Sequence, residues 1–194
     1  MRTCGTDTLV CCMAVLFLLA ASTAAAGDAP AHSANDASAH YFGGLTLVDQ
    51  HGGKVDLYED LMRGKVVIIN SFFATCHGSC PVMIATFKKI EDAFKSDDRI
   101  SLISITVDPA NDTPEKLNAL ATSLNARKDW HFLTGSPQQV QAALGKLGLA
   151  VANRDDHSNI VLVGNLNTGL WKKVLGVAQS GQVIDAVRSV VEDK

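Results

Sequence analysis

Short β-branched runs alternate along the chain with stretches of helical spacing. Residues 65–73 (KVVIINSFF) and 100–107 (ISLISITV) are almost continuously apolar, which is typical of strands buried on both faces of a sheet. Between these runs, apolar residues recur every three or four positions, which predicts a helix with one buried face that contains Met83, Phe87, Ile90 and Phe94.

The same patterns predict the remaining elements. Strands 45–48 and 54–58 flank the turn Gln50-His51-Gly52-Gly53 and form one hairpin, and strands 159–163 and 170–175 form a second. A short strand is expected at 130–133. Three more helices are expected. One begins at Asp112-Thr113-Pro114-Glu115 and another at Ser136-Pro137-Gln138-Gln139. The third lies near the end of the chain and buries Val183, Ile184, Val187, Val190 and Val191.

The order of these elements predicts an α/β fold. A βαβ portion is followed by an antiparallel hairpin and a closing helix, which is the thioredoxin-like order. We therefore expect a thioredoxin-like mixed sheet flanked by helices, with an N-terminal β-hairpin extension. No internal repeat or second domain boundary interrupts this pattern.

The first residues have the pattern of an export signal. Residues 9–21 (LVCCMAVLFLLAA) are apolar, and Ala24-Ala25-Ala26 places small residues at the −3 and −1 positions of a cleavage site. Residues 1–26 are predicted to be a signal peptide, with an uncleaved membrane anchor as the alternative. Residues 27–40 are predicted to be a flexible tether, and 41–194 the folded domain. The expected location is the periplasm or an equivalent exported compartment.

Composition narrows the class of protein further. The chain has 194 residues, of which 47% are hydrophobic and 19% charged, and this excludes a disordered protein. The 168 residues after position 26 suffice for one domain with a core. A formal net charge of −3 argues against nucleic acid as a partner, and membrane contact is expected only through an uncleaved leader.

Candidate chemistry is concentrated at one cysteine pair. Three of the five cysteines lie in the leader, so the exported chain keeps Cys76 and Cys80. The pair lies between a predicted strand and the helix that follows it, where backbone N–H groups favour thiolates. Thiolates attack disulfides and also bind copper. Three residues separate the two cysteines, instead of the two usual in general thiol oxidoreductases of this topology, and both chemistries stay open.

His157 is the candidate for a third ligand. Two sulfurs alone can hold Cu(I), but Cu(II) requires a nitrogen or oxygen ligand as well. His157 precedes the strand at 159–163, where thioredoxin-like proteins usually carry a cis-proline beside the cysteines, and this chain has no proline after Pro137. Asp155 and Asp156 either orient the second ring nitrogen of the imidazole, shield cationic copper, or form a solvated acidic turn.

The other histidines are weaker candidates. His77 adjoins Cys76 directly, so both residues would bind one ion only with strain. His51 lies in a hairpin turn and is expected to face solvent, and His131 lies in a predicted strand and is expected to be structural. His32 and His40 belong to the predicted tether.

Four segments together resemble the Sco/SenC proteins, which are exported thioredoxin-like copper proteins involved in assembling cytochrome c oxidase. The segments are SFFATCHGSCP (71–81), ITVDPANDTPEKL (105–117), WHFLTG (130–135) and DHSNIVLV (156–163). The resemblance implies that Cys76, Cys80 and His157 bind copper, as Cu(I) or Cu(II), and that the cysteines cycle between dithiol and disulfide. It makes 41–194 a thioredoxin-like copper-binding domain.

The chain departs from the family pattern at two places. His-Gly-Ser stands between the cysteines where many relatives have Pro-Asp or similar residues, and Asn165-Leu166-Asn167 stands where many relatives have an acidic turn. The first departure affects the expected redox potential and choice of partner.

Three functions follow as hypotheses. The first is a metallochaperone that delivers copper to the dinuclear copper site of cytochrome c oxidase, with the copper-site subunit or another copper acceptor as its partner. The second is a thiol–disulfide oxidoreductase that reduces the cysteines of a partner protein's copper site, with Cys76 attacking and Cys80 resolving. The third is peroxide reduction, which needs only a reactive thiol.

Overall fold

The computed structural model describes residues 34–76, 78–177 and 180–194. The predicted signal peptide, residues 27–33 of the predicted tether with His32, and His77 lie outside the described residues. None of the helices in the described ranges is long and apolar enough to cross a membrane.

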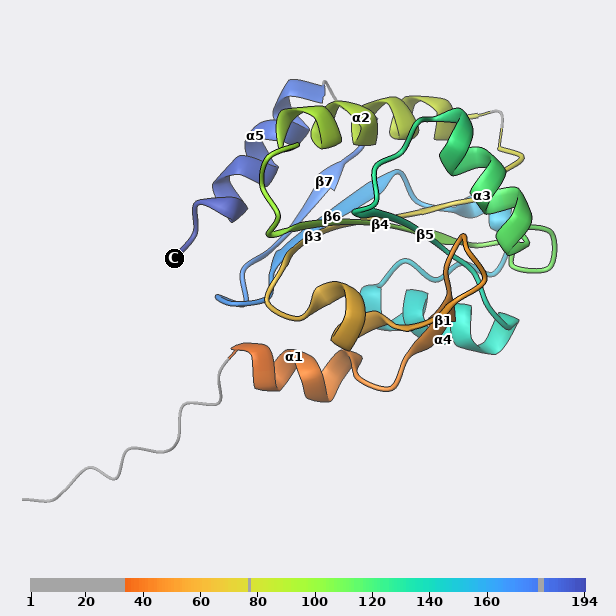
Figure 1. The fold of residues 1–194 in the computed structure, drawn as a ribbon, viewed down its shortest axis with the longest axis horizontal. Helices are drawn as coiled ribbons and strands as arrows, with labels where there is room; N and C mark the ends of the chain where they lie inside the picture. Colours follow the sequence, from red (N-terminus) through yellow and green to blue (C-terminus); the bar gives the residue numbers. More distant parts are fainter. Residues whose placement is uncertain (1–33, 77, 178–179) are drawn as a thin grey trace, which may run out of the picture. The chain divides into compact units, whose positions relative to one another are not determined.

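A five-stranded mixed sheet forms the centre of the domain (Figure 1). Its spatial order is β5-β4-β3-β6-β7. Strands β3, β4 and β5 are parallel, β6 runs antiparallel to β3, and β7 runs antiparallel to β6. The strand bounds are β3 Val66–Phe72, β4 Ile100–Thr106, β5 Trp130–Leu133, β6 Ile160–Asn165 and β7 Trp171–Leu175.

Helices cover both faces of this sheet, as predicted (Figure 1). One face carries α2 (Cys80–Ala93), α3 (Pro114–Ser123) and α5 (Ser180–Val191). The other carries α1 (Ala34–Phe42), the π-helix η1 (Leu57–Met62) and α4 (Pro137–Leu147). The capping box predicted at the start of α4 is present, with Ser136 accepting from the Gln139 backbone N–H.

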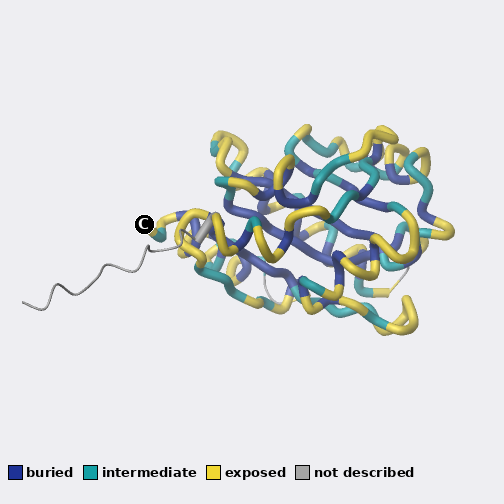
Figure 2. Tube along the Cα trace, turned by 90° about the horizontal axis from the view of Figure 1, so that it is seen from below, coloured by how far each residue is buried: buried dark blue, intermediate teal, exposed yellow. Residues whose placement is uncertain are grey.

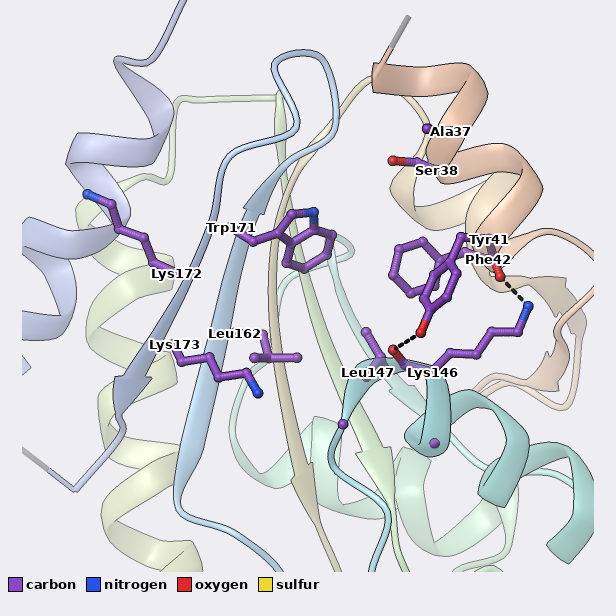
Figure 3. Close-up of a pocket in the computed structure, with 12 residues that line it drawn as sticks. Ala37, Ser38, Tyr41, Phe42, Lys146, Leu147, Leu162, Trp171, Lys172 and Lys173 are labelled. Carbon is purple, nitrogen blue, oxygen red and sulfur yellow. Dashed lines mark hydrogen bonds between the residues drawn. The ribbon is translucent and has the colours of Figure 1, made fainter. Parts of the chain in front are cut away.

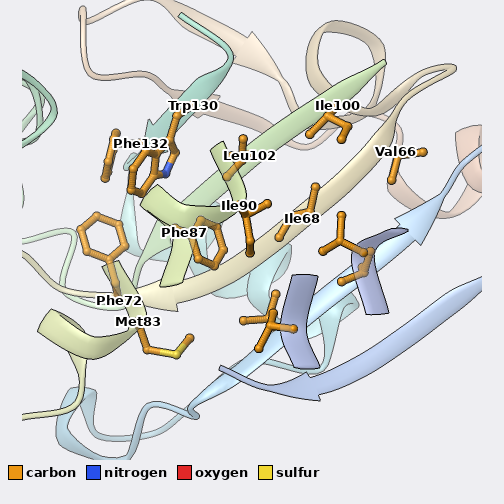
Figure 4. Close-up of a cluster of buried hydrophobic side chains, with 14 of the residues drawn as sticks. Val66, Ile68, Phe72, Met83, Phe87, Ile90, Ile100, Leu102, Trp130 and Phe132 are labelled. Atoms are coloured by element: carbon orange, nitrogen blue, oxygen red, sulfur yellow. The ribbon is translucent and has the colours of Figure 1, made fainter. Parts of the chain in front are cut away.

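Successive side chains of the buried strands point to opposite faces of the sheet, so the hydrophobic core has two parts. Val66 and Ile68 of β3 point into the cluster beneath α2 and α5, which Figure 4 shows with Phe87 and Ile90 of α2. Their neighbours Val67 and Ile69 point into the cluster beneath α1, η1 and α4. Every residue of β3 and β4 is buried. Figure 2 shows the burial of the described residues along the chain.

The predicted tether is wrong for residues 34–40, which belong to α1. The last residue of α1, Phe42, is buried against the folded domain and is only 7% exposed. The centroids of the Phe42 and Trp171 rings lie 5.8 Å apart. The Tyr41 hydroxyl donates to the backbone carbonyl of Lys146. These contacts with α4 and β7 stabilise a helix that its polar composition did not indicate.

The N-terminal hairpin is present but shorter than predicted. Strands β1 (Thr46–Val48) and β2 (Lys54–Asp56) pair as a separate two-stranded sheet. The second strand was expected to run to Tyr58 but ends at Asp56, whose carboxylate accepts hydrogen bonds from the backbone N–H groups of Tyr58 and Glu59. Asp56 therefore caps η1 and stops the strand.

Candidate metal centre

The cysteine loop connects β3 to α2. Cys80 is the first residue of α2, followed by Pro81 in the first turn, and is only 2% exposed, whereas Cys76 lies in the loop and is half-buried. Both are free thiols. The Cys76 backbone N–H donates to the carbonyl of Phe73 over 3.2 Å, which folds the loop back on the end of β3. The arrangement leaves one sulfur near the surface and the other beneath it.

A buried carboxylate fastens this loop to the neighbouring strand. Oδ2 of Asp112, a fully buried residue, accepts from the Ala74 backbone N–H at 3.0 Å and from the Thr106 hydroxyl at 2.5 Å. Burial raises the pKa of Asp112, and the two hydrogen bonds oppose this effect only in part. Asp112 therefore links the end of β4 to the loop that carries Cys76.

His157 reaches the cysteines from the far end of the sequence. It follows the short 3₁₀ helix η2 (Arg154–Asp156) and precedes β6. Its Nε2 lies 3.2 Å from Sγ of Cys80, and its Nδ1 lies 3.1 Å from the carbonyl oxygen of Arg154. A carbonyl only accepts, so Nδ1 carries the hydrogen and Nε2 presents its lone pair to the sulfur.

The three predicted ligands meet at one place. The sulfurs of Cys76 and Cys80 and a ring nitrogen of His157 lie within 4.8 Å of one another, so they can converge on a single ion. Of the residues that the structure describes, these are the only three His, Cys, Asp or Glu side chains so grouped. Two soft sulfurs and one imidazole fit copper, with three-coordinate Cu(I) or with Cu(II) and a further oxygen ligand.

Burial changes the acidity expected for one thiol. Desolvation, with a smaller contribution from the hydrogen bond to Cys76, raises the pKa of Cys80 to about 12. For Cys80 in the dithiol form, burial therefore opposes the thiolate expected at a helix N-terminus. Sγ of Cys80 is thus a thiol sulfur within hydrogen-bond distance of Nε2 of His157, at 3.2 Å.

Arg154 holds the histidine segment against the rest of the site. Its guanidinium forms an ion pair with Asp108, directly after β4, and lies 5.2 Å above the centre of the Phe73 ring. The Phe73 ring in turn meets the His157 ring edge to face, with 5.2 Å between centroids. The Arg154 side chain and carbonyl therefore both fix the position of His157.

Asp155 and Asp156 form a turn next to His157. Both residues are exposed, and Nδ1 of His157 faces the Arg154 carbonyl, so neither carboxylate orients the imidazole. Shielding of the ion by these carboxylates stays a prediction. The sequence alone did not identify Phe73, Asp108, Asp112 and Arg154 as residues that support the site. Asp108 and Asp112 belong to the segment VDPANDTPE (107–115), in which acidic residues follow a buried strand, and this pattern was a usable signal.

The remaining described histidines lie away from this site. His51 is exposed in the hairpin turn, as expected, and His40 is exposed on α1. His131 lies on β5, where burial lowers its pKa.

The sequence matches one protein family over most of its length. Residues 33–192 match the family model described as SCO1/SenC. A curated relative, the SCO1 protein homolog of Bacillus subtilis, is 33% identical over 96 residues, which cover 48% of this chain and 49% of the relative. The match therefore spans about half the length of that relative.

Solved structures confirm the predicted thioredoxin-like fold. A SCO1/SenC family lipoprotein from Bacillus anthracis str. Ames has a TM-score of 0.65 at 24% identity, covering 76% of this chain and 92% of its own. BsSco, reported with a disulfide switch and as a member of the Sco family of cytochrome c oxidase assembly proteins, has a TM-score of 0.64 at 26% identity, covering 77% and 92%. Yeast Sco1 with copper bound has a TM-score of 0.63 at 21% identity, covering 77% and 90%.

Proposed function

Because the chain belongs to the SCO1/SenC family, we propose that it is an exported copper metallochaperone that delivers copper to the dinuclear copper site of cytochrome c oxidase. The observation that carries this proposal is the convergence of Cys76, Cys80 and His157 within 4.8 Å. A general dithiol enzyme has no need of the imidazole that faces Sγ of Cys80. The proposed location is the periplasm or an equivalent compartment, and the proposed partner is the copper-site subunit of the oxidase.

The two cysteine sulfurs differ in burial, and this difference favours the release of copper to an acceptor protein. Cys80 is buried against His157, whereas Cys76 lies in a loop at the rim. A sulfur of the acceptor protein can therefore replace Cys76 first, while Cys80 and His157 still hold the ion. Transfer then proceeds by stepwise ligand exchange, and the ion does not pass through water as a free species.

The thiol–disulfide oxidoreductase is the second candidate, and the free, unequally exposed cysteines favour it. The Cys76 thiolate would attack a disulfide of the partner protein, forming a mixed disulfide and releasing one partner thiolate. Cys80, deprotonated as it attacks, would then displace the second partner thiolate, leaving a Cys76–Cys80 disulfide. The partner disulfide gains the two electrons that the two cysteines lose.

One experiment separates the two candidates. The purified, reduced protein is loaded with one equivalent of copper and mixed with the isolated copper-binding domain of the oxidase subunit in its dithiol form. Intact mass of both proteins reports which one holds copper, the disulfide state of each, and cleavage of the leader. Transfer of copper to the reduced acceptor supports the metallochaperone. Retention of copper, together with rapid reduction of an oxidised acceptor by metal-free protein, would favour the oxidoreductase.

A further inference from the structure

A second cavity lies on the opposite face of the sheet from the copper site. It has a volume of about 600 Å³ and is bounded by α1, the end of α4 and the edge formed by β6 and β7 (Figure 3). Its apolar residues, including Phe42, Leu147 and Leu162, belong to the core cluster beneath α1 and α4, whereas both cysteines belong to the other cluster. The volume falls within the range of about 300–1,000 Å³ that small-molecule sites occupy.

The floor and walls of the cavity are apolar. Phe42 and Trp171 lie with their ring centroids 5.8 Å apart and their planes tilted by 41°. Rings in such contact leave no room for a molecule between them, so a ligand would lie across them. Leu147 and Leu162, which are 5% and 4% exposed, complete this surface.

Three polar side chains that line the cavity can donate a hydrogen bond. Among the described residues, the indole N–H of Trp171, the ammonium of Lys173 and the hydroxyl of Ser38 have no hydrogen-bond partner, and all three residues line the cavity. None of the described residues that line the cavity carries a carboxylate. An indole N–H and an ammonium can only donate, so the cavity is complementary to an anionic acceptor.

Lys173 differs from the two other lysines at the cavity. Lys146 donates to the backbone carbonyl of Tyr41 and lies 5.2 Å above the centre of the Tyr41 ring, and Lys172 donates to the Ser189 hydroxyl on α5 at 2.7 Å. Figure 3 shows the amine of Lys172 directed away from the cavity and that of Lys173 directed toward Leu162. Lys173 is thus the unpaired cation beside an apolar floor.

We propose that this cavity binds an amphipathic carboxylate, with its apolar body against Phe42 and Trp171 and its carboxylate at Lys173. The inference is independent of copper binding, since none of the residues that carry it belongs to the metal centre. Free carboxylates in solution and carboxylates held in a lipid bilayer share this chemistry.

Three ten-carbon probes test the charge requirement on the full purified protein: decanoate below its micellar concentration, decanol, and decyltrimethylammonium. Trp171 fluorescence reports occupancy, because Trp130 is fully buried and donates to Ser104. We expect decanoate to bind saturably and roughly tenfold more tightly than decanol, because its carboxylate forms one charge-assisted hydrogen bond. We expect no binding of decyltrimethylammonium. Equal affinity for decanoate and decanol, or absence of saturable binding, would overturn the proposal.

Two neighbouring lysines provide matched variants. Lys173→Met keeps the length of the side chain but removes its charge, and should weaken decanoate binding roughly tenfold. Lys172→Met makes the same change on the residue directed at α5, and should leave binding unchanged. Equal losses in both variants would show attraction by general surface charge and refute the site.

Phosphatidylcholine vesicles containing oleate distinguish the two sources of the carboxylate. Binding to monomeric decanoate, with or without binding to vesicles, supports the cavity. Cosedimentation with vesicles in the absence of any decanoate binding would refute it and identify this face as a membrane contact.

Discussion

Cys80 and His157 are separated by 77 positions in the chain, yet Sγ and Nε2 lie 3.2 Å apart. The first begins α2 and the second precedes β6, and the antiparallel pairing of β3 with β6 brings the two segments to the same end of the sheet. The topology thus places a third candidate ligand beside the two cysteines.

Replacing this histidine should separate copper binding from thiol chemistry. We expect His157→Ala to weaken Cu(II) binding by more than about a hundredfold, since even changes to groups behind a ligand cost about 10- to 100-fold. Exchange with an oxidised test peptide should persist, because both cysteines remain. Copper titrations and peptide reduction measure the two properties. His51→Ala, at an exposed turn, is the control, and comparable copper affinity for His157→Ala and wild type would remove the ligand assignment.

Arg154 should act on copper through His157. We expect Arg154→Met to weaken Cu(II) binding about 10- to 100-fold and to alter the sulfur-to-copper absorption band, because the histidine segment loses its attachment to Asp108 and Phe73. Arg154→Lys should restore part of the affinity through the charge alone.

Arg63→Met is the matched control, because Arg63 also forms an ion pair and a ring contact, with Glu59 and Tyr58, but away from the site. If Arg154→Met binds copper with the same affinity and spectrum as Arg63→Met, Arg154 does not position the ligand.

Copper loading should release a proton from Cys80. Its pKa is raised to about 12 by burial, so at neutral pH the thiol is protonated and must lose its hydrogen to bind the metal. The apparent affinity should therefore rise about tenfold per pH unit for each proton released. Calorimetry in buffers of different ionisation enthalpy counts these protons. The Cys80→Ser variant lacks this thiol and serves as the comparison for the number of protons released. A copper affinity of the wild-type protein that is independent of pH between 6 and 8 would contradict a protonated Cys80.

Asp112 should make stability depend on pH. Burial raises its pKa, so the folded state holds the proton more tightly than the unfolded state, and the free energy of unfolding falls as pH rises above the ordinary aspartate pKa of about 3.9. Asp112→Asn stays neutral and keeps an oxygen for Ala74 and Thr106. We expect its stability relative to wild type to increase with pH, as measured by urea unfolding. A constant difference across the acid range would contradict the raised pKa.

Gly164 tests the packing at the edge of the sheet. A Cβ at this position of β6 would lie 2.6 Å from the Trp171 ring, its partner on β7. Gly164→Ala should lower the free energy of unfolding by about 1–3 kcal/mol through overpacking. Gly145→Ala in α4, where a Cβ meets nothing within 4 Å, should raise it by about 0.5–1 kcal/mol. Denaturant unfolding of both variants measures the contrast, and equal effects would refute the clash.

Local patterns were sufficient to predict most of the fold. The two continuous apolar runs correspond to β3 and β4, and the short strand at 130–133 has the predicted ends. These predictions succeeded because the spacing of hydrophobic residues reflects which faces of an element are buried. The prediction failed where a contact distant in sequence decides the local structure. Residues 34–40 are polar enough to suggest a tether, but they belong to α1, which is held in place because Phe42 packs on Trp171.

The sequence by itself determined which groups are available at the candidate copper site: two cysteines at a strand–helix junction and an imidazole before the next hairpin. Only the tertiary structure decided how these groups are tuned. It buried Cys80, directed Nδ1 of His157 to the Arg154 carbonyl, and joined Arg154 to Asp108 across 46 positions. Residue types and spacings specify which donors exist, but burial and hydrogen-bond partners depend on segments that meet only after folding, and these set protonation and orientation.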